Sequence, residues 1–160
     1  MTRSADADGW RIVEDDLSGA AIRALLEVHF AGMLANSPAG SCHFLDFDGL
    51  RAGGVTFWSI HRGAELAGCG ALKMLGAGHG EIKSMRTAEM FLRQGVAARM
   101  LGHIIDEARR HGLDRLSLET GSGSAFEPAL ALYRAHGFAE CDPFGDYRPD
   151  PFSRFMTRAV

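Results

Sequence analysis

One stretch, from Glu81 to Leu101, limits most strongly what this chain can fold into. It reads EIKSMRTAEMFLRQGVAARML and predicts a polar strand, a short loop and a helix that opens on the small residues Gly95, Val96 and Ala97. The first backbone N–H groups of such a helix have no partner inside it, and the helix dipole favours negative charge at this end. Because small residues let a ligand approach the backbone closely, the segment is a candidate phosphate site.

Strand-like and helix-like segments alternate along the rest of the chain, without internal repeats, and this order predicts an α/β fold. Gly63 separates two strand-like runs and predicts a β-hairpin, after which a third antiparallel strand begins near Glu81. The run LDRLSLET follows one helix, so a right-handed crossover should place it parallel to the strand at Glu81. The other expected elements are strands over Trp10–Val13, Phe138–Cys141 and Phe152–Thr157, a helix capped by Ser18 and reaching Leu34, and helices over Leu45–Leu50, Gln94–His111 and Pro128–Ala135.

Length and charge fit one compact domain over residues 1–160, with enough chain for a substantial core. The sequence has 17 Lys and Arg against 20 Asp and Glu, so it has no basic field that would draw it to nucleic acid or to an anionic membrane. Its opening, MTRSADADGW, does not read as a signal segment, and no apolar run reaches the roughly 18 residues of a membrane span. Cys42, Cys69 and Cys141 share no metal or redox spacing, so we expect reduced thiols in a cytoplasmic protein.

Tyr133, in the segment LALYRAHGF, completes a pattern that begins with the strand, loop and helix around Gly95. Over residues 70–138 the sequence resembles the GCN5-related N-acetyltransferases (GNAT), whose loop and helix N-terminus hold the pyrophosphate of coenzyme A. The resemblance implies the GNAT fold, a central mixed and mostly antiparallel sheet, flanked by helices, in which one parallel pair of strands splays apart. It also implies an acyltransferase that uses acetyl-CoA to acetylate a primary amine. The family acetylates both small molecules and proteins, and for this chain a small molecule is favoured over a protein. The segments SPAGSCHFLD, EIKSMRT and LETGS further resemble a bacterial subgroup sometimes labelled indoleacetate-type acetyltransferases.

The phosphate loop departs from the family pattern at its first position. Leu92 stands where relatives have Gln or Arg, so backbone donors and the neighbouring Arg93 are left to hold the phosphates. Phe126 is a second departure, because many relatives place there an Asn that contacts coenzyme A. The residues that the resemblance assigns to the coenzyme site are Met85, Arg86, Thr87, Arg93, Gln94, Gly95, Val96, Ala97, Ala98, Phe126 and Tyr133.

Two glutamates are candidates for the base that takes a proton from the amine. Glu81 is the first candidate, at the position of the glutamate base in histone-type relatives, and Glu119 is the second, at the end of the strand after the helix. Alternation along the strand places Glu81, Lys83 and Met85 on one face, so Glu81 can instead pair with Lys83. Glu119 can instead cap the turn that follows it.

Tyr133 is the candidate acid for the departing thiolate, and its alternative role is that of a packed ring with a hydrogen-bonded hydroxyl. The resemblance implies that a backbone N–H within residues 85–87 stabilises the oxyanion, in a direct transfer through a ternary complex. A covalent route through Cys69 or Cys141 is less favoured, since neither cysteine has an adjacent histidine in the sequence.

Two variable segments, residues 37–46 and 142–153, predict a substrate pocket with acidic and aromatic walls that suits a small cationic amine. His29 and His43 flank the first segment and Tyr147 lies in the second, so all three are candidates for substrate contact. Ordinary packed or solvated roles remain open for the two histidines.

No histidine belongs to a metal-ligand motif such as HExxH, and no metal is expected. His103 and His111 fall on the outer face of the predicted helix, where a surface role suffices. A non-catalytic acyl-CoA sensor or interaction module is the alternative to an enzyme. A nucleotide-binding enzyme is disfavoured, because no Gly-Lys-Ser/Thr follows the glycine of the loop. Exposed sheet edges and the habit of the family are compatible with a homodimer.

Overall fold

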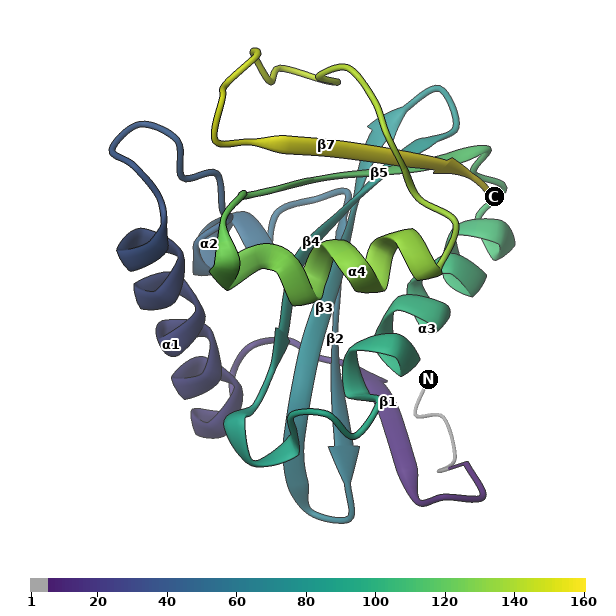
Figure 1. Ribbon diagram of the computed structural model, residues 1–160. Coiled ribbons are helices and arrows are strands. Elements are labelled where there is room, and N and C mark those ends of the chain that lie inside the picture. Colours follow the sequence, from purple (N-terminus) through teal and green to yellow (C-terminus); the bar gives the residue numbers. More distant parts are fainter. Residues whose placement is uncertain (1–5) are drawn as a thin grey trace.

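A seven-stranded sheet organises the computed structural model, which describes residues 6–160 (Figure 1). The strands lie in the order β1-β2-β3-β4-β5-β7-β6. They span Trp10–Glu14 (β1), Val55–Arg62 (β2), Glu65–Gly76 (β3), His79–Thr87 (β4), Arg115–Thr120 (β5), Ala139–Glu140 (β6) and Arg154–Ala159 (β7). The helices span Ala20–Asn36 (α1), Phe47–Leu50 (α2), Val96–Arg110 (α3) and Glu127–Ala135 (α4), with 3-10 turns at Glu89–Phe91 and Ser124–Phe126.

The sheet separates two apolar cores. On one face, α3 and α4 pack against the strands through fully buried side chains such as Leu101, Ile104 and Leu130. On the other face, α1 and α2 cover a smaller core that includes Leu26 and Leu50. Because helices cover both faces, the central strands carry near-continuous apolar runs, as in the sequence VTFWSI of β2.

The predicted hairpin and the third antiparallel strand are confirmed. β2 and β3 pair from Val55 opposite Lys73 to Arg62 opposite Glu65, and Gly63 in the turn has a φ of 58° that glycine adopts without strain. β4 then pairs antiparallel with β3. The three strands therefore form a continuous meander in the middle of the sheet (Figure 1).

β4 and β5 form the predicted parallel pair, and they separate after a short ladder. Only residues 79–81 of β4 pair with residues 115–117 of β5. β5 continues beyond this point beside β7, as far as Thr120 opposite Arg154. The second half of β4 is thus unpaired on the side of β5, and α4 crosses the opening between the two strands (Figure 1). The predicted mixed, mostly antiparallel sheet with one splayed parallel pair is confirmed.

A β-bulge in β4 corrects one prediction. Ser84 and Met85 together lie opposite Gly70, and Ser84 has a φ of 57°. The extra residue turns the Met85 side chain toward the α3 core, where a Cβ atom on Gly70 would lie 2.8 Å from its sulfur. The expectation that Met85 shares a face with Glu81 and Lys83 is therefore wrong, because strict alternation ends at the bulge.

Two local expectations also differ from the structure. His103 is buried rather than on the outer face of α3, since its ring packs edge-on against Trp58 with centroids 5.0 Å apart. Ser18 does not cap α1; its hydroxyl donates to Asp16 at 2.6 Å, and the helix begins after Gly19 without a side-chain cap. The acidic side chain two residues earlier competes successfully for the serine hydroxyl.

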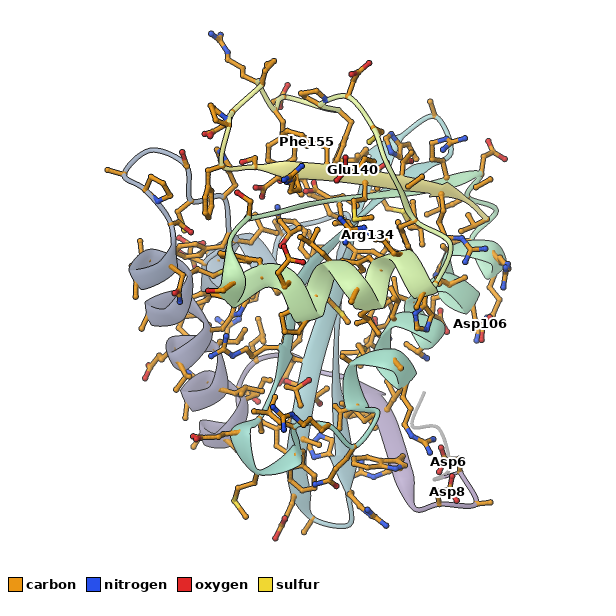
Figure 2. The ribbon with its side chains drawn as sticks, viewed as in Figure 1. Asp6, Asp8, Asp106, Arg134, Glu140 and Phe155 are labelled. Carbon is orange, nitrogen blue, oxygen red and sulfur yellow. The ribbon has the colours of Figure 1, made fainter. Side chains whose placement is uncertain are left out.

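Ion pairs at the N-terminal end of the described chain fasten β1 to α3. Arg99 of α3 contacts Asp6 at 2.5 Å and Asp8 at 2.9 Å, and its guanidinium lies over the Trp10 ring. Figure 2 shows the two aspartates close together beside the start of β1. In the described part of the chain, no helix is long and apolar enough to cross a membrane.

Gly68 lets β3, β4 and α3 approach one another closely. A Cβ atom there would lie 2.7 Å from the Arg86 carbonyl oxygen and 2.9 Å from Val96. Because a backbone atom cannot move aside cheaply, Gly68→Ala should lower the free energy of unfolding by about 2 kcal/mol in urea denaturation. Gly102→Ala is the control, since a Cβ atom there meets nothing within 4 Å and alanine favours a helix by about 0.5–1 kcal/mol. Equal effects of the two substitutions would contradict the prediction.

Candidate active site

A cavity of about 190 Å³ opens where β4 and β5 separate, and we call it the central cavity. Its walls are residues 82–86 of β4, the end of β5, the 3-10 turn at 124–126, one side of α4, the second half of α1 and residues 43–44. The candidate residues Glu119, Tyr133, His29 and His43 all line it. The separation of the two strands thus brings together residues that lie more than one hundred positions apart in the sequence.

Glu119 lies at the end of β5 and faces this cavity. Burial raises the pKa of its carboxyl to about 7, and the nearby carboxylates of Glu81 and Asp150 add to the rise, while the Lys83 ammonium opposes it. A carboxyl with a pKa near neutrality changes between acid and base at working pH. Glu119 is therefore suited to accept a proton from a bound ligand.

Tyr133 lies between the central cavity and a second, larger cavity. Its side chain is 6% exposed, and its ring packs edge-on against Phe138. Burial raises the pKa of its hydroxyl, which therefore stays protonated at neutral pH. Among residues 6–160 the hydroxyl has no hydrogen-bond partner, so it is available to a ligand that passes between the cavities.

The second cavity, the helix groove, measures about 790 Å³ and runs past the N-terminus of α3. Gly95 precedes this helix in the left-handed conformation, with a φ of 81°, and no side chain caps the first turn. The N–H groups of Val96, Ala97 and Ala98 are consequently left for another acceptor. Arg93, which also has a positive φ, adds a positive charge to the same wall.

Most residues that the sequence assigns to the coenzyme line the helix groove, and two do not. Gln94 donates from its amide to the Met90 carbonyl at 3.2 Å and is absent from the groove wall. Phe126 lies in the central cavity instead, packed edge-on against Phe152. The residues that do line the groove are Met85, Arg86, Thr87, Arg93, Gly95, Val96, Ala97, Ala98 and Tyr133.

Glu81 is engaged by two neighbours. Its carboxylate accepts hydrogen bonds from the Lys83 ammonium at 3.1 Å and from the Tyr147 hydroxyl at 2.5 Å, and its side chain is only 4% exposed. Lys83 also donates to Tyr147 at 2.9 Å. Burial and the Glu81 charge raise the pKa of Tyr147, which remains a neutral donor. The predicted alternative for Glu81, an ion pair with Lys83, is present in the structure.

A third cavity of about 700 Å³, the loop groove, lies between the end of β3 and the loop over residues 145–150. Tyr147 and His43 both line it, and their rings meet edge-on with centroids 5.4 Å apart. Its charged wall residues are of both signs: Lys73, Glu81, Asp146, Arg148 and Asp150. The acidic wall expected from the 142–153 segment is therefore balanced by basic residues.

Two features of the central cavity were not predicted from the sequence: the place of the Arg86 side chain and the presence of Asn36. The side chain of Arg86 runs toward α1, where a Cβ atom on Gly32 would lie 3.5 Å from both terminal nitrogens. Its sequence position predicted only a backbone role, and the lack of a side chain at Gly32 was the one signal of this contact. Asn36, the last residue of α1, also lines the cavity. In the part of the chain that the structure describes, no cluster of three His, Cys, Asp or Glu residues could hold a metal ion.

Comparison with known proteins agrees with this geometry. The model of the Acetyltransferase (GNAT) family matches residues 20–138, which include the strands around the central cavity, α3 and α4. The chain belongs to the GNAT acetyltransferase family. It is 54% identical over 146 residues to the uncharacterized N-acetyltransferase YsnE of Bacillus subtilis (strain 168), covering 91% of this chain and 97% of that protein. It is 40% identical over 124 residues to the IAA acetyltransferase of Azospirillum brasilense, covering 77% and 80%.

Solved structures share the fold. The acyl-CoA N-acyltransferase structure from Klebsiella pneumoniae has a TM-score of 0.76 at 26% identity, over 94% of this chain and 97% of that chain. A GNAT family acetyltransferase from Elizabethkingia anophelis, solved with acetyl-CoA bound, has a TM-score of 0.68 at 20% identity, over 96% and 99%. This GNAT chain is therefore an acyltransferase of a family whose members bind acetyl-CoA.

Lys83 compensates a buried charge in this GNAT chain, and the cost of removing it can be measured. Lys83→Met leaves the Glu81 carboxylate buried without a cation, which should lower the free energy of unfolding by about 3 kcal/mol. The double variant Lys83→Met/Glu81→Gln removes the charge as well and should recover most of this loss. Urea denaturation at neutral pH measures both values. Equal losses in the single and double variants would show that the Glu81 charge is not the cause.

Proposed function

We propose that this GNAT enzyme transfers an acetyl group from acetyl-CoA to a primary amine of a small molecule, directly and in a ternary complex. One observation carries the proposal: the helix groove and the central cavity meet at Met85, Arg86, Ala129 and Tyr133. A thioester held in the groove would reach Glu119 and Tyr133 at this junction. A cavity of about 190 Å³ favours a small acceptor over a folded protein.

The helix groove provides the contacts that coenzyme A requires. The free N–H groups at the start of α3 and the charge of Arg93 suit the pyrophosphate. Beyond Glu81, the unpaired edge of β4 offers backbone groups to the amides of the pantetheine arm. An N–H of the same edge, within residues 85–87, can stabilise the oxyanion, an interaction worth roughly 3 kcal/mol in a dry site.

Glu119 is the base that the environment favours. Its pKa of about 7 suits proton transfer at neutral pH, and it lines the cavity together with Tyr133. Glu81 is the weaker candidate, because its carboxylate already accepts hydrogen bonds from Lys83 and Tyr147 and does not line the central cavity. Glu81 would instead position Lys83 and Tyr147 beside the acceptor.

The transfer step balances with these residues. The amine nitrogen attacks the thioester carbon and forms the C–N bond, and its proton passes to Glu119, directly or through water. The C–S bond then breaks, and the thiolate of coenzyme A takes a proton from Tyr133, which solvent replaces. No covalent enzyme intermediate forms, and burial raises the pKa of the Cys69 thiol to about 12, which disfavours its thiolate as a nucleophile.

We also propose a cytoplasmic location and a homodimeric assembly for this enzyme. The three free cysteines fit a reducing cytoplasm. The 40% identity to an IAA acetyltransferase supports a place in the subgroup of that name, without fixing the acceptor of this chain. We propose a homodimer formed through a sheet edge, which light scattering would test.

A non-catalytic acyl-CoA sensor is the second candidate. Leu92 supports it, because this residue is 54% exposed on the rim of the helix groove and supplies no polar contact. Turnover separates the two functions, since a sensor would bind acetyl-CoA without releasing free coenzyme A in the presence of any amine.

Acetyl-CoA should stabilise the protein selectively. At a concentration near 100 times its dissociation constant, linkage predicts about 2.7 kcal/mol, or a rise in Tm of roughly 5 to 10 °C. Thermal unfolding with acetyl-CoA, and with ATP as the negative control, measures this shift. No shift with acetyl-CoA, or an equal shift with ATP, would refute the proposed cofactor.

Glu119→Gln should change the pH dependence of acetylation. Because the raised pKa leaves Glu119 increasingly protonated below about pH 7, the ratio of wild-type to variant kcat/KM should increase with pH and level off above that value. At pH 8 we expect a ratio of roughly 100 or more. Tyr133→Phe is the comparison variant. It should lower kcat, while kcat/KM should still rise with pH near pH 7 as in the wild type. A constant ratio for Glu119→Gln from pH 5.5 to 8.5 would assign the base elsewhere.

A further inference from the structure

Arg86 is a cation without a counter-ion in the wall of the central cavity. It is half-buried, and it forms no ion pair or side-chain hydrogen bond with any residue of the described chain 6–160. Lys83, the other cation of this wall, is neutralised by Glu81. Partial burial of a guanidinium without a paired anion costs free energy. Its planar N–H donors can bind a carboxylate through two parallel hydrogen bonds.

His29 is a second, independent indication that a ligand binds at this place. Its side chain lines the central cavity from α1, one turn before Gly32, and the residue is only 6% exposed. Its Nδ1 atom is buried and has no hydrogen-bond partner in the described chain. Burial, followed by the charge of Arg86, lowers the pKa of His29 to about 4, so the ring is neutral and carries one N–H. A buried polar atom of this kind is ordinarily satisfied by water or by a ligand.

The charged groups of the cavity divide into two poles. Arg86 acts electrostatically on His29 at the α1 wall, whereas Lys83, Glu81 and Asp150 act on Glu119 at the β5 wall. Glu119 is the one carboxylate among the described residues that line the cavity. An acidic pole and a basic pole in one small cavity complement a molecule that carries both an ammonium and a carboxylate.

We propose that the acceptor is an amino acid or a similar small amine with a carboxylate, whose carboxylate binds Arg86 and His29 while its amine faces Glu119. This inference rests on the proposed acetyl transfer and narrows its substrate class. It also gives the Arg86 side chain a role in acceptor binding, separate from any backbone contact of β4 with the coenzyme. The basic groups of the loop groove, Lys73 and Arg148, lie outside the central cavity and are not required.

The test compares matched acceptors. The twenty amino acids are incubated with acetyl-CoA and the enzyme beside their carboxamides, which keep the amine and lack the anion, and release of coenzyme A is followed. We expect at least one free acid to be acetylated with a kcat/KM roughly 10- to 100-fold above that of its amide, the range of one charged hydrogen-bonded contact. Transfer to amides with equal or higher efficiency, or to none of the acids, overturns the inference.

Variants of Arg86 then locate the contact. Arg86→Gln should raise KM for the acid by roughly 10- to 100-fold, leave KM for its amide unchanged, and leave KM for acetyl-CoA within about twofold. Arg86→Lys should recover part of the loss, and Arg51→Gln, which removes an exposed arginine beyond α2, is the matched control. A raised KM for acetyl-CoA with an unchanged KM for the acid would assign Arg86 to the coenzyme phosphates and overturn the inference.

The same experiments distinguish failure of the proposed acetyl transfer from failure of the proposed carboxylate site. Without acetyl-CoA binding, the acetyltransferase proposal fails as a whole. Binding of acetyl-CoA together with transfer to amides alone leaves that proposal intact and refutes only the carboxylate site.

Discussion

The end of the ladder between β4 and β5 after Glu81 is the constraint on which the rest of the structure depends. Beyond this point the facing edges of β4 and β5 no longer pair with each other, while β5 stays paired with β7 along its opposite edge. β4 keeps β3 on one side and leaves its other edge open, where the bulge at Ser84 further displaces the chain. The cavity, the free edge and the junction with the helix groove all result from this single loss of pairing.

Much of the fold could be predicted from the sequence because its signals are local. The glycine turn at Gly63 and the apolar spacing of α3 each depend on a few neighbouring residues, and both appear as expected. The bulge could not be predicted, since Ser84 carries no turn signal and its conformation depends on how β3 and α3 pack around Gly70. The burial of His103 against Trp58 depends in the same way on a distant strand.

Most residues of the candidate site could be predicted from the sequence, but the different roles of its two glutamates could not. The sequence places Glu81 first, on the strand before the phosphate loop, and Glu119 second, at the end of the strand after the helix. Their environments separate them: the carboxyl of Glu81 is bound by Lys83 and Tyr147, while burial raises the pKa of Glu119 to about 7. Tyr147 lies 66 positions from Glu81, so no local pattern could reveal this pairing.

The anchoring of α1 has a consequence for how molecules exchange at the site. The buried residues of this helix, Ile22, Leu26 and His29, all lie in its first ten positions, so its C-terminal turns contribute little to the core. Those turns, held chiefly by aromatic contacts of Phe30 with Phe44 and Phe47, form one wall of the central cavity. Local opening there exposes little apolar surface and requires far less free energy than global unfolding. Under the proposed function, acceptor and product would therefore enter and leave through fluctuations of one helix end, while β5, which carries Glu119, and α4, which carries Tyr133, remain fixed.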